Sequence, residues 1–154
     1  MRSSFPLALG FIIYMLIMSV VSIGWAQSEG RVLILKSSAY TSSPQETDGT
    51  PKITATGAQT RLGVIAVSPD LLSTDLPYGS IVKLDDLGNW KNGAGAGQFN
   101  GLLGSQLFVV EDTMSPSRRQ QIDVWMPDRA LALRFGVRRI QLTVVQYGRT
   151  PGGP

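Results

Sequence analysis

The chain has 154 residues, of which 43% are hydrophobic and 16% are charged, and its formal net charge is +3. It contains no histidine and no cysteine. Together these absences exclude histidine-assisted nucleophiles, imidazole or thiolate metal sites and disulfide bonds. The length and composition are typical of one folded domain. Any acid–base chemistry therefore depends on Asp, Glu, Lys or Tyr side chains.

The N-terminal segment has the pattern of an export signal. Residues 5–26 contain no charged side chain, Arg2 precedes them, and Gly24 and Ala26 are small residues at the end of the run. This pattern predicts a secretory signal peptide over residues 1–26, cleaved after Ala26. A run of this length could also remain uncleaved as an N-terminal membrane anchor. In either case we expect an exported, periplasmic protein whose contact with the membrane, if any, is through this segment.

Six segments have the composition of β-strands, because they are rich in branched or alternating apolar residues and are bounded by turn residues. Pro127 and Asp128 at one end and Gly136 at the other predict one short helix. Closing a small sheet removes its exposed edges. The pattern therefore predicts an all-β fold, a six-stranded barrel with one short helix, over residues 27–148. The expected strands cover residues 32–40, 62–67, 80–84, 107–110, 121–125 and 138–145.

Two segments are predicted to lack packed structure. Residues 85–106 contain six glycines, which favour a flexible excursion or a long hairpin. Residues 149–154 are predicted to form a disordered tail. Trp90 lies in the glycine-rich segment, where an aromatic side chain without a core to join is a candidate for stacking on a sugar. The alternative for Trp90 is a structural contact.

The charged residues are unevenly distributed, with seven arginines in residues 118–154. This distribution indicates either a solvated basic face or a surface that attracts an anionic polymer such as the cell wall. Nucleic acid is not an expected partner of an exported chain. The arginines are Arg118, Arg119, Arg129, Arg134, Arg138, Arg139 and Arg149.

Two aspartates are candidates for acid–base chemistry. Asp123 is embedded in the expected strand 121–125, where alternation directs it opposite to Ile122 and Val124. Burial of such a carboxyl raises its pKa, as a general acid at neutral pH requires. Asp112 follows the strand 107–110 directly. For both residues the structural alternatives remain open: an arginine ion pair or loop hydrogen bond for Asp123, and additionally a turn or cap for Asp112.

Several short motifs, taken in this order and spacing, resemble the three-aspartate (3D) domain family. The resemblance covers roughly residues 38–145, and the step of eleven residues from Asp112 to Asp123 is similar to that between the second and third aspartates of the family. The motifs are Ser38-Ala39-Tyr40-Thr41, Thr54-Ala55-Thr56-Gly57, Gly63-Val64-Ile65-Ala66-Val67, Leu76-Pro77-Tyr78-Gly79, Glu111-Asp112-Thr113, Ile122-Asp123-Val124 and Ala132-Leu133-Arg134-Phe135-Gly136.

The resemblance implies a double-psi β-barrel like that of membrane-bound lytic transglycosylase A and of the stationary-phase survival muralytic proteins. It further implies cleavage of peptidoglycan glycan strands to 1,6-anhydro products by a monomer that needs no metal or other cofactor. On this pattern Asp123 protonates the glycosidic oxygen and then accepts a proton from the C6 hydroxyl, while Asp112 supports it. The implied substrate-binding positions are Thr56, Gly57, Ser68 and Thr113, with Trp90 as the loop candidate.

The sequence departs from the family pattern at two places. Ser68 stands where the family has its first aspartate, and Asp70 follows two residues later. Met114 and Ser115 replace two glycines that would allow a close approach of the glycan. These departures keep a second hypothesis open, in which the barrel binds the cell wall or another glycan without cleaving it.

Overall fold

The structure is a computed structural model that describes residues 30–43 and 51–148. The predicted export segment and the predicted tail lie outside these ranges. Within them, no helix is long and apolar enough to cross a membrane.

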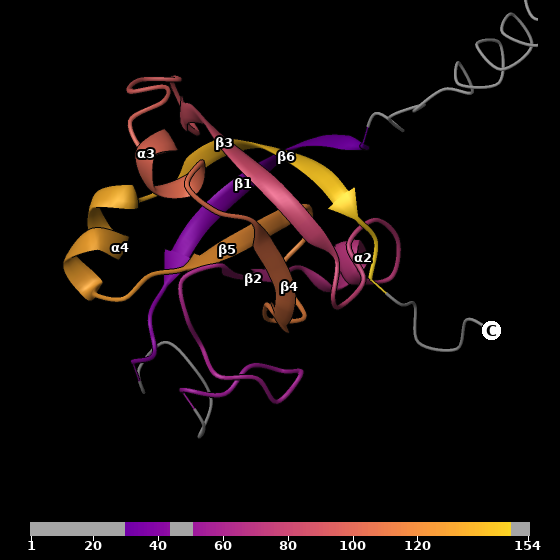
Figure 1. Ribbon diagram of the computed structural model, residues 1–154. Coiled ribbons are helices and arrows are strands. Elements are labelled where there is room, and N and C mark those ends of the chain that lie inside the picture. The colour runs from indigo at the N-terminus through magenta and orange to yellow at the C-terminus, as the bar shows by residue number, and fades with distance from the viewer. Residues whose placement is uncertain (1–29, 44–50, 149–154) are drawn as a thin grey trace, which may run out of the picture.

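Six strands form a closed barrel in the order β1-β5-β2-β4-β3-β6 (Figure 1). The pairs β1/β5 and β2/β4 are parallel, and the other four pairs are antiparallel. Two parallel pairs inside an otherwise antiparallel closed barrel give the double-psi arrangement, and closure leaves no free sheet edge. The strands are β1 (Val32–Tyr40), β2 (Val64–Val67), β3 (Ile81–Asn89), β4 (Phe108–Thr113), β5 (Gln121–Trp125) and β6 (Arg138–Gln146).

Three short helices accompany the barrel in the described ranges. The predicted one is α4 (Arg129–Phe135), which begins after Asp128 and ends at Gly136. The Asp128 side chain accepts a hydrogen bond from the Leu131 amide at 2.8 Å, so Asp128 is the N-cap and Pro127 precedes the helix instead of standing in its first turn. The sequence analysis did not predict α2 (Pro69–Leu72) or α3 (Asn100–Leu103). In Figure 1, α3 and α4 lie on one side of the barrel and α2 on the other.

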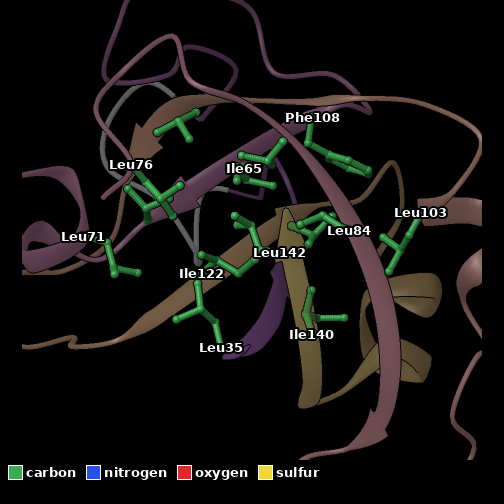
Figure 2. Packing of buried hydrophobic residues seen from close by; sticks show 14 of the residues in the cluster. Leu35, Ile65, Leu71, Leu76, Leu84, Leu103, Phe108, Ile122, Ile140 and Leu142 are labelled. Atoms are coloured by element: carbon green, nitrogen blue, oxygen red, sulfur yellow. The ribbon is translucent and has the colours of Figure 1, made fainter. Parts of the chain in front are cut away.

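The barrel interior is filled by side chains from alternate positions of the strands. In β5, Ile122 and Val124 are fully buried while Asp123 between them points outward, as the alternation predicts. Leucine and isoleucine side chains from the other strands converge with Phe108 on the same interior, as Figure 2 shows. Each fully buried side chain of this size contributes about 1.5–3 kcal/mol to folding. The packed interior holds the outer face of β5 in a fixed position.

The prediction for residues 85–106 is wrong, because this segment is packed. Strand β3 continues to Asn89, and Leu103 is fully buried. The organising group is the buried Asp86 carboxylate, which accepts bonds from Arg138 Nε at 2.9 Å and Nη2 at 2.6 Å. It also accepts the backbone amides of Gly88 at 2.9 Å and Phe99 at 3.1 Å.

The glycines of this segment serve defined backbone positions. Gly88 has φ 102°, and a Cβ at this position would lie 2.2 Å from the carbonyl oxygen of Gly93. The Arg138 guanidinium also donates to the Gly95 carbonyl and lies 5.0 Å from the centre of the Phe99 ring. High glycine content here reflects a tight fold around an ion pair.

Candidate active site

A pocket of about 590 Å³ opens on the outer face of the barrel, above β2 and β5. Its walls come from the ends of β1 and β4 and from two loop segments, residues 51–55 and 114–118. Asp112 and Asp123 both line it, so the structure brings the two predicted catalytic residues together. The remaining lining residues are Tyr40, Pro51, Ile53, Thr54, Ala55, Ala66, Thr113, Met114, Ser115, Pro116 and Arg118.

The two aspartates share one neighbour, Ala66 in β2. Ala66 is the Cα partner of Asp112 in β4 and of Asp123 in β5. The register between β2 and β4 shifts at Ile65/Ala66, and because of this shift Asp112 stands opposite Ala66 where regular pairing would place Glu111. Paired Cα atoms on neighbouring strands lie about 5 Å apart. The two carboxyl groups therefore flank a single methyl group.

Asp123 has a neutral hydrogen-bond donor beside it. The Ser38 hydroxyl, on the neighbouring β1, donates to Asp123 Oδ1. No ion pair to Asp123 is formed within residues 30–43 and 51–148. The arginine ion pair that the sequence left open for Asp123 is made instead by Asp86.

Burial dominates the electrostatics of Asp123. It raises the pKa of this carboxyl above its ordinary value, and the negative charge of Asp112 adds to the effect. The hydrogen bond from Ser38 and the positive charge of Arg118 oppose it. The net rise favours a protonated carboxyl, the state in which Asp123 can donate a proton to a ligand in the pocket.

Asp112 is held as an acceptor by three donors. Tyr40 Oη donates to Asp112 Oδ2 at 3.0 Å, and the amides of Ala55 and Thr113 donate to Oδ1 at 3.1 and 2.9 Å. Burial, together with the adjacent Asp112 carboxylate, raises the pKa of Tyr40, which keeps its phenol protonated as a donor. Asp112 is thus held in a fixed orientation beside the protonatable Asp123.

One wall of the pocket is apolar. Tyr40, Ala66 and Met114 form a small buried cluster, against which Trp125 packs. Met114 is only 8% exposed and occupies the position where the family pattern has glycine. The Trp125 indole donates to the Ser42 hydroxyl at 3.0 Å, which fixes this ring at the border of the cluster. Met114 therefore contributes an apolar side chain to the wall of the pocket.

Ser68 does not line the pocket, and the prediction that it contacts substrate is corrected. Its side chain is fully buried, and its hydroxyl accepts the Gln121 amide at 3.3 Å. Asp70 does not line the pocket either. Its carboxylate accepts the amide and the Nε2 of Gln120 at 3.1 and 2.7 Å. Ser68 and Asp70 together secure the chain at the beginning of β5.

The other predicted binding positions fall into two groups. Thr113 lines the pocket, and Thr56 and Gly57 lie in the adjoining turn, where the Thr56 amide donates to the Glu111 carbonyl at 3.1 Å. Trp90 lies outside the lining, on the loop that follows β3, which Figure 1 shows at the opposite end of the barrel from residues 51–60. Its ring lies 5.7 Å from the Arg139 guanidinium. Trp90 is thus remote from the two aspartates.

Sequence reasoning did not assign a role to Ser38, Tyr40 or Ala66. The first two occupy alternate positions of β1, so they face the same side of the sheet, and this polar alternation at the end of an apolar strand is a readable signal. Ala66 gives no such signal, because its position between the aspartates depends on the register shift. Among the described residues, no group of three or more acidic side chains is arranged to hold a metal ion.

No protein family and no curated protein matches the sequence. Similar solved structures include the lytic transglycosylase MltA of Escherichia coli, with a TM-score of 0.42, 15% identity, and coverage of 68% of this chain and 30% of MltA. Another is a mutant of the Clavibacter michiganensis expansin in complex with cellohexaose, with a TM-score of 0.40, 15% identity, and coverage of 80% and 54%. The chain thus spans between about a third and a half of the length of these proteins. The likeness concerns the arrangement of strands.

Proposed function

We propose that this protein cleaves peptidoglycan glycan strands by a lytic transglycosylase-type reaction, with Asp123 as the acid and base. The observation that carries the proposal is the pairing of two unlike carboxyl groups in one open pocket. Asp123 is half-buried and has a raised pKa, whereas Asp112 accepts hydrogen bonds from three donors. The motif resemblance to the three-aspartate domain, including membership of that family, is part of the same proposal.

The inequality of the two carboxyl groups favours this reaction over ordinary hydrolysis. A glycosidase that uses water or a covalent intermediate requires two working carboxyl groups, one acid and one base or nucleophile. The oxygens of Asp112 are already directed at protein donors, because the amides of Ala55 and Thr113 donate to one of them and Tyr40 donates to the other. A reaction in which the substrate's own hydroxyl attacks needs one carboxyl group for both proton transfers. Asp123 is sufficient for that reaction.

The proposed steps balance without water. Asp123 gives its proton to the glycosidic oxygen as the bond from that oxygen to the muramic acid C1 breaks. The C6 hydroxyl of the same sugar forms a bond to C1, and the resulting Asp123 carboxylate takes the C6 hydroxyl proton. The products are a 1,6-anhydro sugar and a new free sugar hydroxyl. Asp112 stabilises positive charge that develops at C1 and keeps Asp123 protonated at the start of the cycle.

The proposal places the protein in the periplasm. The apolar run of residues 5–26 supports export, and the arginines of the last part of the chain suit an anionic wall polymer. The partner in this proposal is the glycan strand, and the acting form is a monomer.

The test is the product formed from purified peptidoglycan sacculi. We expect the purified protein to release anhydro-muropeptides. These products should contain no ¹⁸O when the reaction is run in ¹⁸O-labelled water. Asp123→Asn should lower the rate at least about a thousandfold, since it removes both proton transfers. A product that carries ¹⁸O, or an Asp123→Asn variant as active as the wild type, would overturn the proposed reaction.

A second function, binding of the glycan without cleavage, is favoured by one observation. Met114 fills space beside Tyr40 and Ala66 where the family pattern has glycine. The discriminating experiment is sedimentation with sacculi at low and high salt. Binding that weakens with salt, combined with no anhydro product, would establish the binding function in place of the enzyme. A Met114→Gly variant that gains cleavage would identify this side chain as the obstacle.

A further inference from the structure

We propose that Arg118 receives a carboxylate of the glycan ligand, so that the pocket selects anionic glycans over neutral ones. The inference deepens the proposed function, because it rests on a glycan strand occupying the pocket beside Asp123. It assigns a role to a side chain that neither proton transfer requires.

Arg118 differs from the paired arginines of the molecule. Arg31, Arg61 and Arg138 each form an ion pair with a carboxylate, at 2.7, 2.8 and 2.6 Å. Arg118 lines the pocket, and no carboxylate of the described residues forms an ion pair with its guanidinium. Its charge nevertheless reaches Asp123, whose pKa it lowers. A cation that forms no ion pair within residues 30–43 and 51–148 thus stands at the pocket, where its charge acts on the proposed acid.

The loop that carries Arg118 is held in place at both ends. The Arg118 amide donates to the Ser115 carbonyl at 2.9 Å, which closes a turn at the pocket rim. The next residues are anchored by Asp70, which accepts two bonds from Gln120. Arg119 turns its guanidinium to the Pro116 and Arg118 carbonyls. Of these two neighbouring arginines, one is used to shape the loop and the other is presented to the pocket.

The chemistry of the site points to a carboxylate as the bound group. A guanidinium binds carboxylates with two parallel hydrogen bonds, a geometry that neutral hydroxyls do not match. Apolar side chains of Pro51, Ile53 and Pro116 line the same pocket and offer no competing acceptor to the guanidinium. A glycan strand can supply a carboxylate from two sources, the lactyl ether of muramic acid or a peptide attached to it. The chemistry is common to both.

Binding of a ligand carboxylate to Arg118 would also affect the pKa of Asp123. The charged or titratable groups around Asp123 are Arg118 on the loop, Asp112 on β4 and the neutral Tyr40 phenol on β1. Arg118 is the cationic member and opposes the rise in the pKa of Asp123. A bound carboxylate neutralises this opposition, so Asp123 remains protonated to a higher pH. An anionic ligand would therefore keep Asp123 protonated, and able to cleave that ligand, to a higher pH.

The binding experiment uses the Asp123→Asn protein, in which the amide imitates the protonated carboxyl and no cleavage interferes. Three ligands are compared at low salt: a peptide-free muramic acid tetrasaccharide with free lactyl carboxylates, its peptide-bearing counterpart and neutral chitotetraose. We expect one or both anionic ligands to bind about fivefold more tightly than chitotetraose, the order expected of a partly solvated ion pair. Preference for the peptide-free ligand identifies the lactyl group, preference for the peptide-bearing ligand identifies the peptide, and equal binding of both shows that either carboxylate is accepted.

Two variants and one control decide the role of Arg118. Arg118→Gln in the same protein should abolish the preference, and Arg118→Lys should retain part of it. Arg134→Gln is the matched control, because Arg134 is an exposed arginine of α4, which contributes no residue to the pocket. In the cleaving protein, Arg118→Gln should raise KM for the anionic strand. It should also move the alkaline limb of kcat measured with a neutral strand to higher pH, so that the limbs for the two strands no longer differ.

The outcomes separate this inference from the proposed function. Equal binding of chitotetraose, or a preference that survives Arg118→Gln, would overturn the role of Arg118 even if sacculi are cleaved. A charge preference that depends on Arg118, in a protein that releases no anhydro product, would support the inference while overturning the proposed reaction.

Discussion

Two aspartates of this barrel, the buried Asp86 and the half-buried Asp123, have opposite environments. Asp86 accepts both arms of the Arg138 guanidinium and two backbone amides, and it is almost fully buried. Burial opposes its ionisation, but these bonds together lower the pKa of Asp86. Asp123 has a serine hydroxyl as its hydrogen-bond partner, and burial raises its pKa. The same side chain is thus a permanent anion at one place and a proton donor at the other.

The comparison shows that partners, more than burial, decide what a buried carboxyl does. Arg138 satisfies Asp86 completely, so this aspartate organises the glycine-rich loop. At Asp123 no described arginine forms an ion pair, and the nearest positive charge stands on an exposed loop. A carboxyl left in this state costs stability in its charged form and gains reactivity in its neutral form.

The largest effect is expected from Arg138→Met. This change leaves the Asp86 carboxylate buried without its cation and should lower the free energy of unfolding by about 3–5 kcal/mol. Chemical denaturation measures the loss. Arg139→Met is the matched control, since Arg139 is the exposed neighbour and its loss should cost about 0.5 kcal/mol. Equal losses for the two variants would show that the buried pair does not hold the loop.

This buried pair also marks where sequence reasoning fails. The glycines of residues 85–106 predict flexibility. Asp86 and Arg138 are 52 residues apart, so the local sequence contains no signal of the contact that orders this segment. Strands β1 and β5 were predicted with their observed bounds, since apolar alternation is a local signal. For α2, the Ser68-Pro69-Asp70 sequence is a readable helix start, with a serine N-cap followed by proline and an acidic residue.

The candidate site was predictable in its chemistry but not in its geometry. An aspartate between two apolar strand residues identified Asp123. Its position relative to Asp112, however, depends on the register shift at Ala66, which places Asp112 opposite this alanine. A shift of one residue is a tertiary feature with no local sequence signal. The position of Ser68 also depends on tertiary structure, because it begins α2 and is fully buried outside the pocket.

The second prediction concerns the anion beside the acid. Asp112→Asn removes a negative charge that raises the pKa of Asp123, so the alkaline limb of kcat should move to lower pH. Activity above this limb falls about tenfold for each pH unit of displacement. The asparagine oxygen can keep the bonds from Ala55 and Thr113 that Oδ1 now accepts. A pH–rate profile measures the displacement, and an unchanged limb would contradict the electrostatic role of Asp112.

Asp123→Asn is expected to raise the free energy of unfolding, whereas Arg138→Met lowers it. The raised pKa of Asp123 means that its ionisation disfavours the folded state, so stability is lost as pH rises from the unfolded value of about 3.9 through the folded value. Asp123→Asn removes this loss and should stabilise the protein by about 1 kcal/mol at neutral pH. The gain should vanish at acid pH. Denaturation across a pH series checks it, and a variant that is less stable at neutral pH would contradict it.

For Asp86 the pH dependence has the opposite direction. Its lowered pKa gives stability that is present above the unfolded value and is lost as pH falls through the folded value. The acid limb of the stability profile should therefore disappear in Asp86→Asn, whereas Asp123→Asn should leave it in place. The two variants together assign the loss of stability at acid pH to Asp86 and the loss of stability at higher pH to Asp123.

The smallest effect is expected from Trp90→Ala. Trp90 lies on the loop organised by Asp86, packs beside Arg139 and does not line the pocket, so kcat/KM on glycan strands should stay within about twofold of the wild type. Trp125→Ala is the contrasting variant, because Trp125 packs against Tyr40 and Met114 at the pocket wall and its loss should reduce activity more. If Trp90→Ala weakens glycan binding more than Trp125→Ala does, the loop contacts the strand. The end of the barrel organised by Asp86 would then belong to the binding surface as well as to the scaffold.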